Sequence, residues 1–330
     1  MRTSNQAVTE VAWTLPGPLA RLRPEACGLL TMLNARTWQV GDPVLLELVR
    51  VRVAQLIGNP AAARVRCAYA AAAGGPGLDA KVAALPAYPR SALFSAAERD
   101  VVAFTEQFVI DVGGTTQEMR ASLSGRLGTD GARALVTAIF VVEFTQRLQL
   151  VAARLLGNAA MAATHSPGSL DGSPAGLLDA YQAAVVRDSA LDPVTTELVR
   201  LRCARTHHCR ICQTLRLADA RAAGADEAMT AQVDWYEHSD LPERAKVALR
   251  ITDAFITRPD LLSDATAERA RTLLGPAQLA SLCLDITKWS TQKIHVALDT
   301  DGADTLVTDA DGVALFGFDA SGHPTGYRRR

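Results

Sequence analysis

Apolar residues recur every three to four positions along most of this chain, the spacing of helices that bury one face. Over 276–298 the apolar residues of that face are Leu279, Leu282, Cys283 and Ile286. The same spacing predicts further helices over 96–109, 131–155, 241–256 and 265–274. Alanine and leucine are abundant and aromatic residues make up only 5%, which also favours packed helices over sheets. We therefore expect an all-α protein.

A different pattern occurs near the C-terminus. Residues 305–308 and 313–318 are rich in strand-forming side chains and flank the sequence Asp309-Ala310-Asp311-Gly312. Such a segment predicts a small C-terminal β-hairpin. The two aspartates suggest a calcium loop, but the glutamate that such a loop needs downstream is missing, so we interpret them as a turn.

The chain repeats itself. GDPVLLELVRVRVA at 41–54 and LDPVTTELVRLRCA at 191–204 share nine of fourteen positions at an offset of 150. A second, shorter repeat, at an offset of 146, relates Thr-Gln-Arg at 145–147 to Thr-Gln-Lys at 291–293. Two repeated segments in the same order predict a tandem duplication of one helical domain.

The boundary between the two copies is predicted from composition. The segment GNAAMAATHSPGSLDGSPA, at 157–175, is rich in glycine, serine, proline and alanine, which is typical of linkers. We place the break near residue 165, giving domains 1–165 and 166–330. A helical domain with an exposed apolar face also tends to pair with copies of itself, so we expect a homo-oligomer, a dimer or trimer of fused chains.

Charge and hydropathy limit the classes of binding partner that the chain can have. The formal net charge is -1, and no basic stripe occurs before the three terminal arginines, so no nucleic-acid partner is expected. The N-terminus lacks the apolar core of a signal peptide, and the apolar run near 134–142 is too short to span a bilayer. These features predict a cytoplasmic protein without membrane contact, whose partner is a small molecule or another protein.

Two of the six cysteines, Cys209 and Cys212, form a C-x-x-C motif directly after His207 and His208. A cysteine at a helix N-terminus is stabilised as a thiolate, and a second one turn later can close a disulfide. Either histidine could shuttle protons. Alternatively, the thiols could be zinc ligands or packing residues, but a Cys₄ zinc site needs a second C-x-x-C, which is absent. We expect redox chemistry with no metal and no cofactor.

Glu197, followed by eleven residues and then by Cys209-x-x-Cys212, resembles the motif of alkylhydroperoxidase D-like proteins in the carboxymuconolactone decarboxylase superfamily. The resemblance implies an all-helical domain that recurs in tandem or assembles into oligomers. It also implies a proton relay in which the glutamate, both cysteines and a histidine four residues later activate the thiols. The thiols then reduce a peroxide, and a partner protein or a lipoyl group reduces the resulting disulfide.

One position departs from that pattern, because Arg216 stands where the family has its histidine. Arginine stays protonated and cannot shuttle protons. His207 or His208 is the remaining candidate carrier. Arg66 occupies the equivalent place in the first half, so a structural salt bridge, with the shared glutamate as a candidate partner, is as well supported as an electrostatic role.

The first half lacks the thiol pair. Asn59 and Ala62 stand where the second half has its cysteines, although Glu47 still matches Glu197. We therefore interpret 1–165 as a degenerate alkylhydroperoxidase D-like domain and 166–330 as the redox-active one. The surviving Glu47 weakens the case that Glu197 serves catalysis alone.

The leading hypothesis is a thiol-dependent oxidoreductase of peroxidase type, reducing hydroperoxides or disulfides through a Cys209/Cys212 dithiol–disulfide cycle. Glu197, His207 and His208 are the other predicted catalytic residues. Two alternatives stay open: a carboxymuconolactone decarboxylase-like lyase and a non-enzymatic stress-response scaffold. Three weaker site candidates lie in the predicted helix 276–298, namely Lys288, Trp289 and His295.

Overall fold

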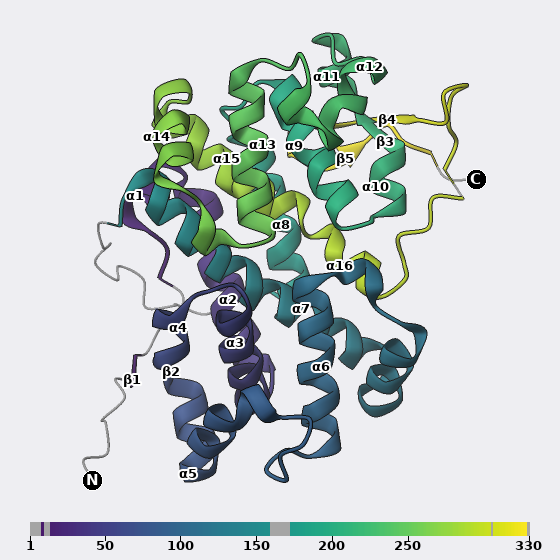
Figure 1. Cartoon of the computed structure of the whole chain (residues 1–330). Helices are drawn as coiled ribbons and strands as arrows, with labels where there is room; N and C mark the ends of the chain where they lie inside the picture. Colours follow the sequence, from purple (N-terminus) through teal and green to yellow (C-terminus); the bar gives the residue numbers. More distant parts are fainter. Residues whose placement is uncertain (1–7, 10–13, 159–171, 305, 329–330) are drawn as a thin grey trace.

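The computed structural model describes residues 8–9, 14–158, 172–304 and 306–328, and Figure 1 shows their arrangement. These residues are mostly helical, with sixteen α-helices and five short strands. The helices before the undescribed segment 159–171 are α1 Gly17–Leu22, α2 Pro24–Val40, α3 Pro43–Leu56, α4 Pro60–Arg64, α5 Ala68–Ala84, α6 Ala96–Ile110 and α7 Gln117–Leu156. Those after it are α8 Pro174–Arg187, α9 Pro193–Thr206, α10 Arg210–Thr214, α11 Ala218–Ala222, α12 Glu227–Ala231, α13 Glu243–Ile256, α14 Asp264–Leu273, α15 Pro276–Trp289 and α16 Gln292–Ala297. The predicted boundary near residue 165 lies outside the described residues.

Local sequence signals explain where these helices begin. Asp42 and Asp192 accept hydrogen bonds from the first amides of α3 and α9, each followed by proline at the first helical position. Ser95 and Glu98 form a reciprocal capping box at the start of α6. The predicted helices are confirmed, except that the one expected over 276–298 is interrupted after Trp289 and continues as α16.

The elements around the sequence repeat recur at the same offset of 150. Helix α3 corresponds to α9 and α4 to α10, and strand β2 (Arg66–Cys67) overlaps the position equivalent to β3 (Leu215–Leu217). The turn before each short helix has a left-handed residue at the same place, Gly58 with φ 73° and His208 with φ 56°. The repeated sequence therefore folds into the same helix–turn–helix–strand unit twice.

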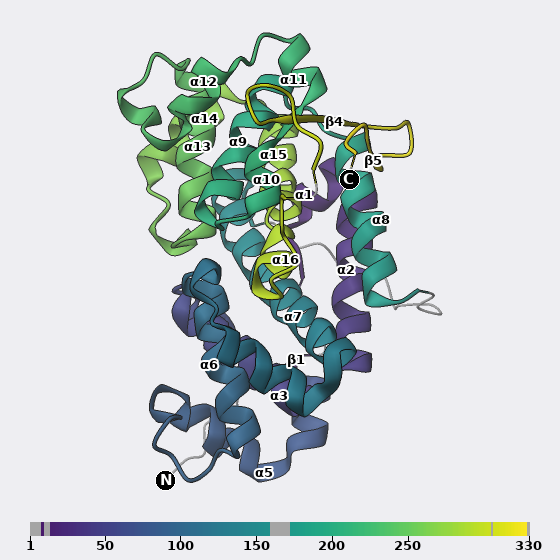
Figure 2. The same cartoon turned by 90° about the vertical axis from the view of Figure 1, so that its right-hand side faces the viewer.

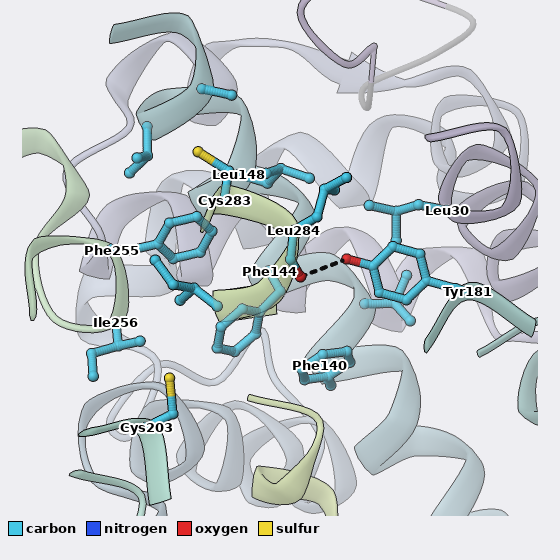
Figure 3. Packing of buried hydrophobic residues seen from close by; sticks show 14 of the residues in the cluster. Leu30, Phe140, Phe144, Leu148, Tyr181, Cys203, Phe255, Ile256, Cys283 and Leu284 are labelled. Carbon is cyan, nitrogen blue, oxygen red and sulfur yellow. Dashed lines mark hydrogen bonds between the residues drawn. The ribbon is translucent and has the colours of Figure 1, made fainter. Parts of the chain in front are cut away.

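A shared hydrophobic core joins the two halves of the chain. Phe140 and Phe144 of α7 stack on each other, and Phe144 also stacks on Phe255 of α13. Figure 3 shows this packing, together with the hydroxyl of Tyr181, which donates to the Leu284 carbonyl at 3.3 Å. Helix α7 crosses the middle of the molecule in Figure 2. It contains a stretch long and apolar enough to cross a membrane, but 78% of that stretch is buried inside the protein, as in a core helix.

A buried charged cluster also crosses between the halves. The Lys293 ammonium of α16 donates to both carboxylate oxygens of Glu143 on α7, at 2.9 and 2.8 Å. Arg147 donates to the same carboxylate at 2.8 Å and to the carbonyls of Phe255 and Thr257. Burial lowers the pKa of Lys293 to about 8, with Glu143 opposing that effect. Arg147 and Lys293 occupy the third position of the Thr-Gln-Arg and Thr-Gln-Lys repeat.

The C-terminal strands form a small sheet with β3. Strand β4 (Ala314–Phe318) pairs in parallel with β3 and antiparallel with β5 (Pro324–Thr325). A small C-terminal hairpin is thus present, but it pairs β4 with β5, and the expected pairing of 313–318 with 305–308 is wrong. The 309–312 segment is a turn, in which the Asp309 carboxylate accepts from the amides of Asp311 and Val313. A two-residue contact, β1 (Val8–Thr9) with β2, forms the other sheet.

Candidate active site

The C-x-x-C cysteines lie where α9 ends and α10 begins. Cys209 is the N-cap residue of α10 and Cys212 lies within it. The two are joined by a disulfide, with their Cα atoms 5.3 Å apart, inside the range that such a bond requires. Cys209 is fully buried and Cys212 is half-buried. Cys212 is therefore the more accessible of the two cysteines.

The other four cysteines, Cys27, Cys67, Cys203 and Cys283, are free and buried. Burial raises the pKa of Cys27, Cys203 and Cys283 to about 12. A thiol that cannot ionise is neither a good nucleophile nor a metal ligand. Within the described ranges, no group of three or more His, Cys, Asp or Glu side chains is arranged to hold a metal ion.

His208 makes the turn that carries the chain from α9 into the motif. Its left-handed backbone lets the Cys209 amide reach back to the Ala204 carbonyl at 2.9 Å, as the Asn59 amide reaches the Ala54 carbonyl after Gly58. The imidazole is exposed and lies against Gly113, where an added Cβ would come within 2.7 Å of the ring. Histidine rarely adopts this conformation, which suggests that the side chain itself is useful.

Replacing His208 with glycine separates the contribution of its left-handed backbone from that of its imidazole. We expect His208→Gly to leave the free energy of unfolding unchanged or raised by up to about 1 kcal/mol, because glycine adopts a positive φ freely. If the imidazole carries protons, thiol-dependent turnover falls in the same variant. Urea unfolding and steady-state kinetics measure these outcomes, with Gly58→Ala as a control that should lose stability. A less stable His208→Gly protein would show that the imidazole has a packing role.

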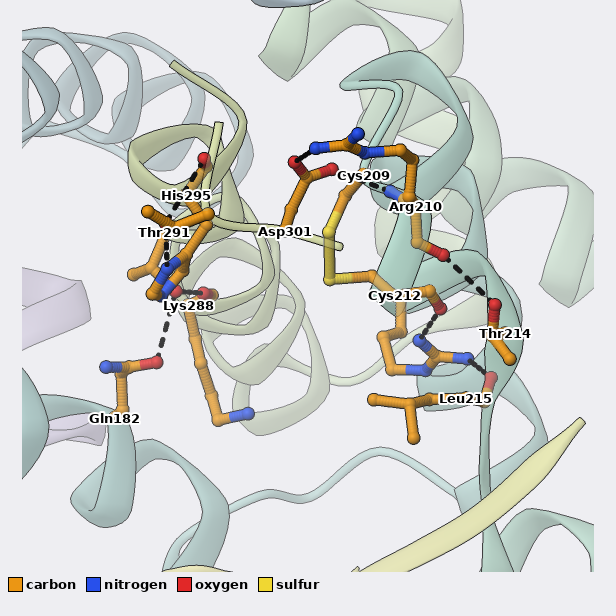
Figure 4. The surroundings of a disulfide bond; sticks show 12 residues. Gln182, Cys209, Arg210, Cys212, Thr214, Leu215, Lys288, Thr291, His295 and Asp301 are labelled. Atoms are coloured by element: carbon orange, nitrogen blue, oxygen red, sulfur yellow. Dashed lines mark hydrogen bonds and ion pairs between the residues drawn. A yellow bond between two sulfur atoms is a disulfide. The ribbon is translucent and has the colours of Figure 1, made fainter. Parts of the chain in front are cut away.

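A carboxylate that the sequence did not single out covers the start of α10. Figure 4 shows Asp301 beside Cys209. Its carboxylate accepts from the Arg210 amide at 2.8 Å and from the Arg210 guanidinium at 2.6 Å, while its carbonyl accepts from the Ile211 amide at 3.0 Å. Burial raises the pKa of the Asp301 carboxyl, but the Arg210 hydrogen bonds more than offset this, and the pKa is lowered. Asp301 is therefore a buried, ionised group next to the cysteines.

Glu197 is held by Arg200 rather than by the thiols. Arg200, one turn later on α9, donates to both carboxylate oxygens, at 2.6 and 2.8 Å. Arg200 also donates to the carbonyls of Cys212 and Leu215, at 2.7 and 2.5 Å. Both side chains are almost fully buried. Glu197 thus supports the loop of the C-x-x-C motif through Arg200.

The arginine at the position of the family histidine makes a different salt bridge. Arg216 pairs with Glu227 at 2.8 Å and donates to the carbonyls of Gln213 and Leu215. Its counterpart Arg66 pairs with Asp79 at 3.0 Å and also approaches Glu47, at 4.0 Å. The predicted salt bridge is present in both halves, but in the second half its partner is Glu227 and not the shared glutamate.

His207 points into the core of the protein. Its Nε2 atom lies 3.1 Å from the Ser290 hydroxyl, and its ring packs edge-on against Phe144. Burial lowers the pKa of His207 well below its ordinary value, and the charges of Lys293 and Arg147 lower it further. His207 is therefore a neutral imidazole in the folded protein.

A buried amine also lies near the disulfide. Lys288 of α15, shown in Figure 4, packs its ammonium against the Trp289 and Phe318 rings, at 3.1 and 4.7 Å from their centres. Burial lowers the pKa of Lys288 to about 7 and raises that of Asp285, one turn earlier, to about 7. The other two weaker site candidates, Trp289 and His295, lie in different surroundings. Trp289 packs against the C-terminal sheet, whereas His295 is exposed beside Thr300.

Comparison with known proteins identifies relatives of the chain and a family that its second half matches. The model of the carboxymuconolactone decarboxylase family matches residues 175–251, which include both cysteines and Glu197. Two uncharacterized proteins of Mycobacterium tuberculosis, from strains CDC 1551 and H37Rv, are each 35% identical over 234 residues, covering 68% of this chain and 82% of the relative. No solved structure matches the chain. The chain belongs to the carboxymuconolactone decarboxylase family, which includes alkylhydroperoxidase D-like peroxidases.

Proposed function

We propose that the protein is a thiol-dependent oxidoreductase that reduces hydroperoxides or disulfides with Cys209 and Cys212. The observation that carries this proposal is the C-x-x-C pair at the start of α10, close enough to be joined as a disulfide, with Cys212 half-buried. The four other thiols are all buried, so this pair is the thiol chemistry that a substrate can reach.

The different exposure of the two cysteines supports the following division of roles. Cys212, as the more accessible thiolate, attacks the outer oxygen of a hydroperoxide. The O–O bond breaks, the alcohol leaves with a proton, and Cys212 becomes a sulfenic acid. The Cys209 thiol then attacks that sulfur, releasing water and closing the disulfide. Two electrons pass from the dithiol to the peroxide, and an external dithiol, from a partner protein or a lipoyl group, returns them.

The predicted proton carriers differ in how well they fit this cycle. His208 is exposed and directly precedes Cys209, so it can exchange protons with solvent. His207 is buried against Ser290, and Glu197 is occupied by Arg200. We assign proton transfer to His208 and the positioning of the motif to Glu197.

We also propose that the first half is a degenerate copy of the same domain. The offset of 150 that relates α3 to α9 and α4 to α10 supports this proposal, as does the Glu47–Arg50 pair. Asn59 and Ala62 in place of the cysteines leave that copy without thiol chemistry.

A thiol count tests the proposed function. The reduced chain has six thiols, and treatment with one equivalent of cumene hydroperoxide should leave four when they are counted in denaturant. One equivalent of alcohol should form, and reduced lipoamide should restore the two lost thiols. If all six thiols survive both cumene hydroperoxide and a small disulfide, the chain is not a thiol oxidoreductase, and the lyase and scaffold alternatives remain.

A further inference from the structure

The two halves complete the N-terminus of the short helix in different ways. In the first half, Asn59 caps α4 with its own side chain, whose oxygen accepts from the Ala62 amide at 3.1 Å. The equivalent residue in the second half is Cys209, which makes no such hydrogen bond. Asp301 instead supplies acceptors from another part of the chain, taking the amides of Arg210 and Ile211. Where the first half has the capping residue Asn59, the second half therefore has Cys209 together with the carboxylate of Asp301, which is distant in sequence.

That carboxylate changes the charge around the thiols. Arg210 carries one positive charge and donates to both Asp299 and Asp301, at 2.6 Å each. The group formed by these three residues, 210, 299 and 301, therefore has a net charge of -1. The Asp301 side chain is only 2% exposed, whereas those of Asp299 and Arg210 are 53% and 55% exposed. Water screens the outer two charges more than the inner carboxylate.

Other charged groups near the motif largely cancel. Glu197 and Arg200 form a closed pair, and Asp285 offsets Lys288. His208 faces solvent. Asp301 is therefore the buried charge that acts most directly on Cys209, because its carboxylate accepts from the amide of the next residue, Arg210.

A cysteine thiolate is usually stabilised by free amides and positive potential at a helix N-terminus. Here the first two amides of α10 are already bonded, and the nearest buried charge is negative. The thiol and the disulfide are both neutral, so this charge disfavours only the thiolate. We propose that Asp301 is a positioning residue that holds the reduced pair in its thiol form. The pair is then slow to react with adventitious oxidants and, at alkaline pH, more strongly reducing than a pair without this carboxylate.

The variant Asp301→Asn tests the proposal, because it removes the charge and keeps an oxygen that can accept from the Arg210 amide. We expect the lowest thiol pKa of the reduced Cys209/Cys212 pair, followed by iodoacetamide alkylation against pH, to fall by about one unit. The alkylation rate at pH 7 should then rise about threefold, since the tenfold gain in thiolate is partly offset by lower nucleophilicity. At pH 9 the equilibrium with glutathione should shift roughly fivefold toward the dithiol.

Asp299→Asn is the matched control, as it removes an exposed carboxylate from the same arginine and should change the thiol pKa by less than about 0.3 unit. Arg210→Gln removes the positive charge and should raise the thiol pKa, an opposite sign that a loss of packing would not produce. The proposal is overturned if Asp301→Asn changes no more than Asp299→Asn, or if the wild-type thiol already titrates well below 8.5. The inference rests on the proposed dithiol chemistry, but alkylation and glutathione equilibration measure the pair directly. If the protein reduces no hydroperoxide, these two measurements still test the role of Asp301.

Discussion

Cys212→Ser is expected to lower hydroperoxide or disulfide turnover by a factor on the order of 10³ or more, because a serine hydroxyl does not ionise or reduce a peroxide near neutral pH. Cys209→Ser should lose multiple turnover to a similar degree, yet keep the first step. Its Cys212 would attack once and remain a sulfenic acid, since no second thiol is within reach. Peroxide-consumption kinetics and dimedone labelling of Cys212 followed by mass spectrometry measure both outcomes.

The matched control for these variants is Cys203→Ala, which removes a buried thiol from α9 outside the pair. It should cost stability and leave turnover per folded molecule unchanged. Retention of more than a tenth of the activity in Cys212→Ser would show that another group performs the reduction. Dimedone labelling of Cys209 in place of Cys212 would reverse the roles assigned from their exposure.

Arg200→Met is expected to lower the free energy of unfolding by about 3–5 kcal/mol, because it leaves the Glu197 carboxylate buried without its partner. The carbonyls of Cys212 and Leu215 also lose their donor. Chemical denaturation measures the change. The double variant Glu197→Leu with Arg200→Met should recover part of the loss, since no unpaired charge then remains.

The repeat supplies an internal control. Arg50 donates to Glu47 at 2.8 and 2.6 Å and to the carbonyls of Ala62 and Val65 at 2.7 and 2.5 Å, the same pattern 150 residues earlier. Arg50→Met should therefore cost a similar free energy while leaving the thiol pKa of the C-x-x-C pair unchanged. If Arg200→Met is no less stable than the wild type, the Glu197–Arg200 pair makes no net contribution to the free energy of folding.

The sequence was sufficient for the parts of the fold that local signals determine. The helices expected over 96–109, 241–256 and 265–274 are present as α6, α13 and α14. The C-x-x-C motif lies at the start of a short helix, as its spacing indicated. Helix α2 was not predicted, because Thr31, Asn34 and Thr37 interrupt its apolar pattern. In the structure these side chains bond the carbonyls four residues earlier and so remain compatible with a buried helix.

The parts of the site that escaped prediction depend on contacts distant in sequence. Asp301 reaches Arg210 across 91 residues, and no spacing rule relates the two. The partner of Arg216 is Glu227 on α12, a helix that the first half replaces with the longer α5. The inward orientation of His207 likewise follows from the packing of α7 and α15 around it.

The Glu143–Lys293 bridge has a consequence for how the two halves depend on each other. It joins a carboxylate of the first half to an ammonium of the second, and both side chains are buried. Separated halves would expose the shared apolar core and lose this pairing, so neither half is expected to persist as an independent protein. The half without the C-x-x-C pair is therefore expected to be required for the folding of the half that carries it. Its contribution would be to stability and solubility rather than to the chemistry of the thiols.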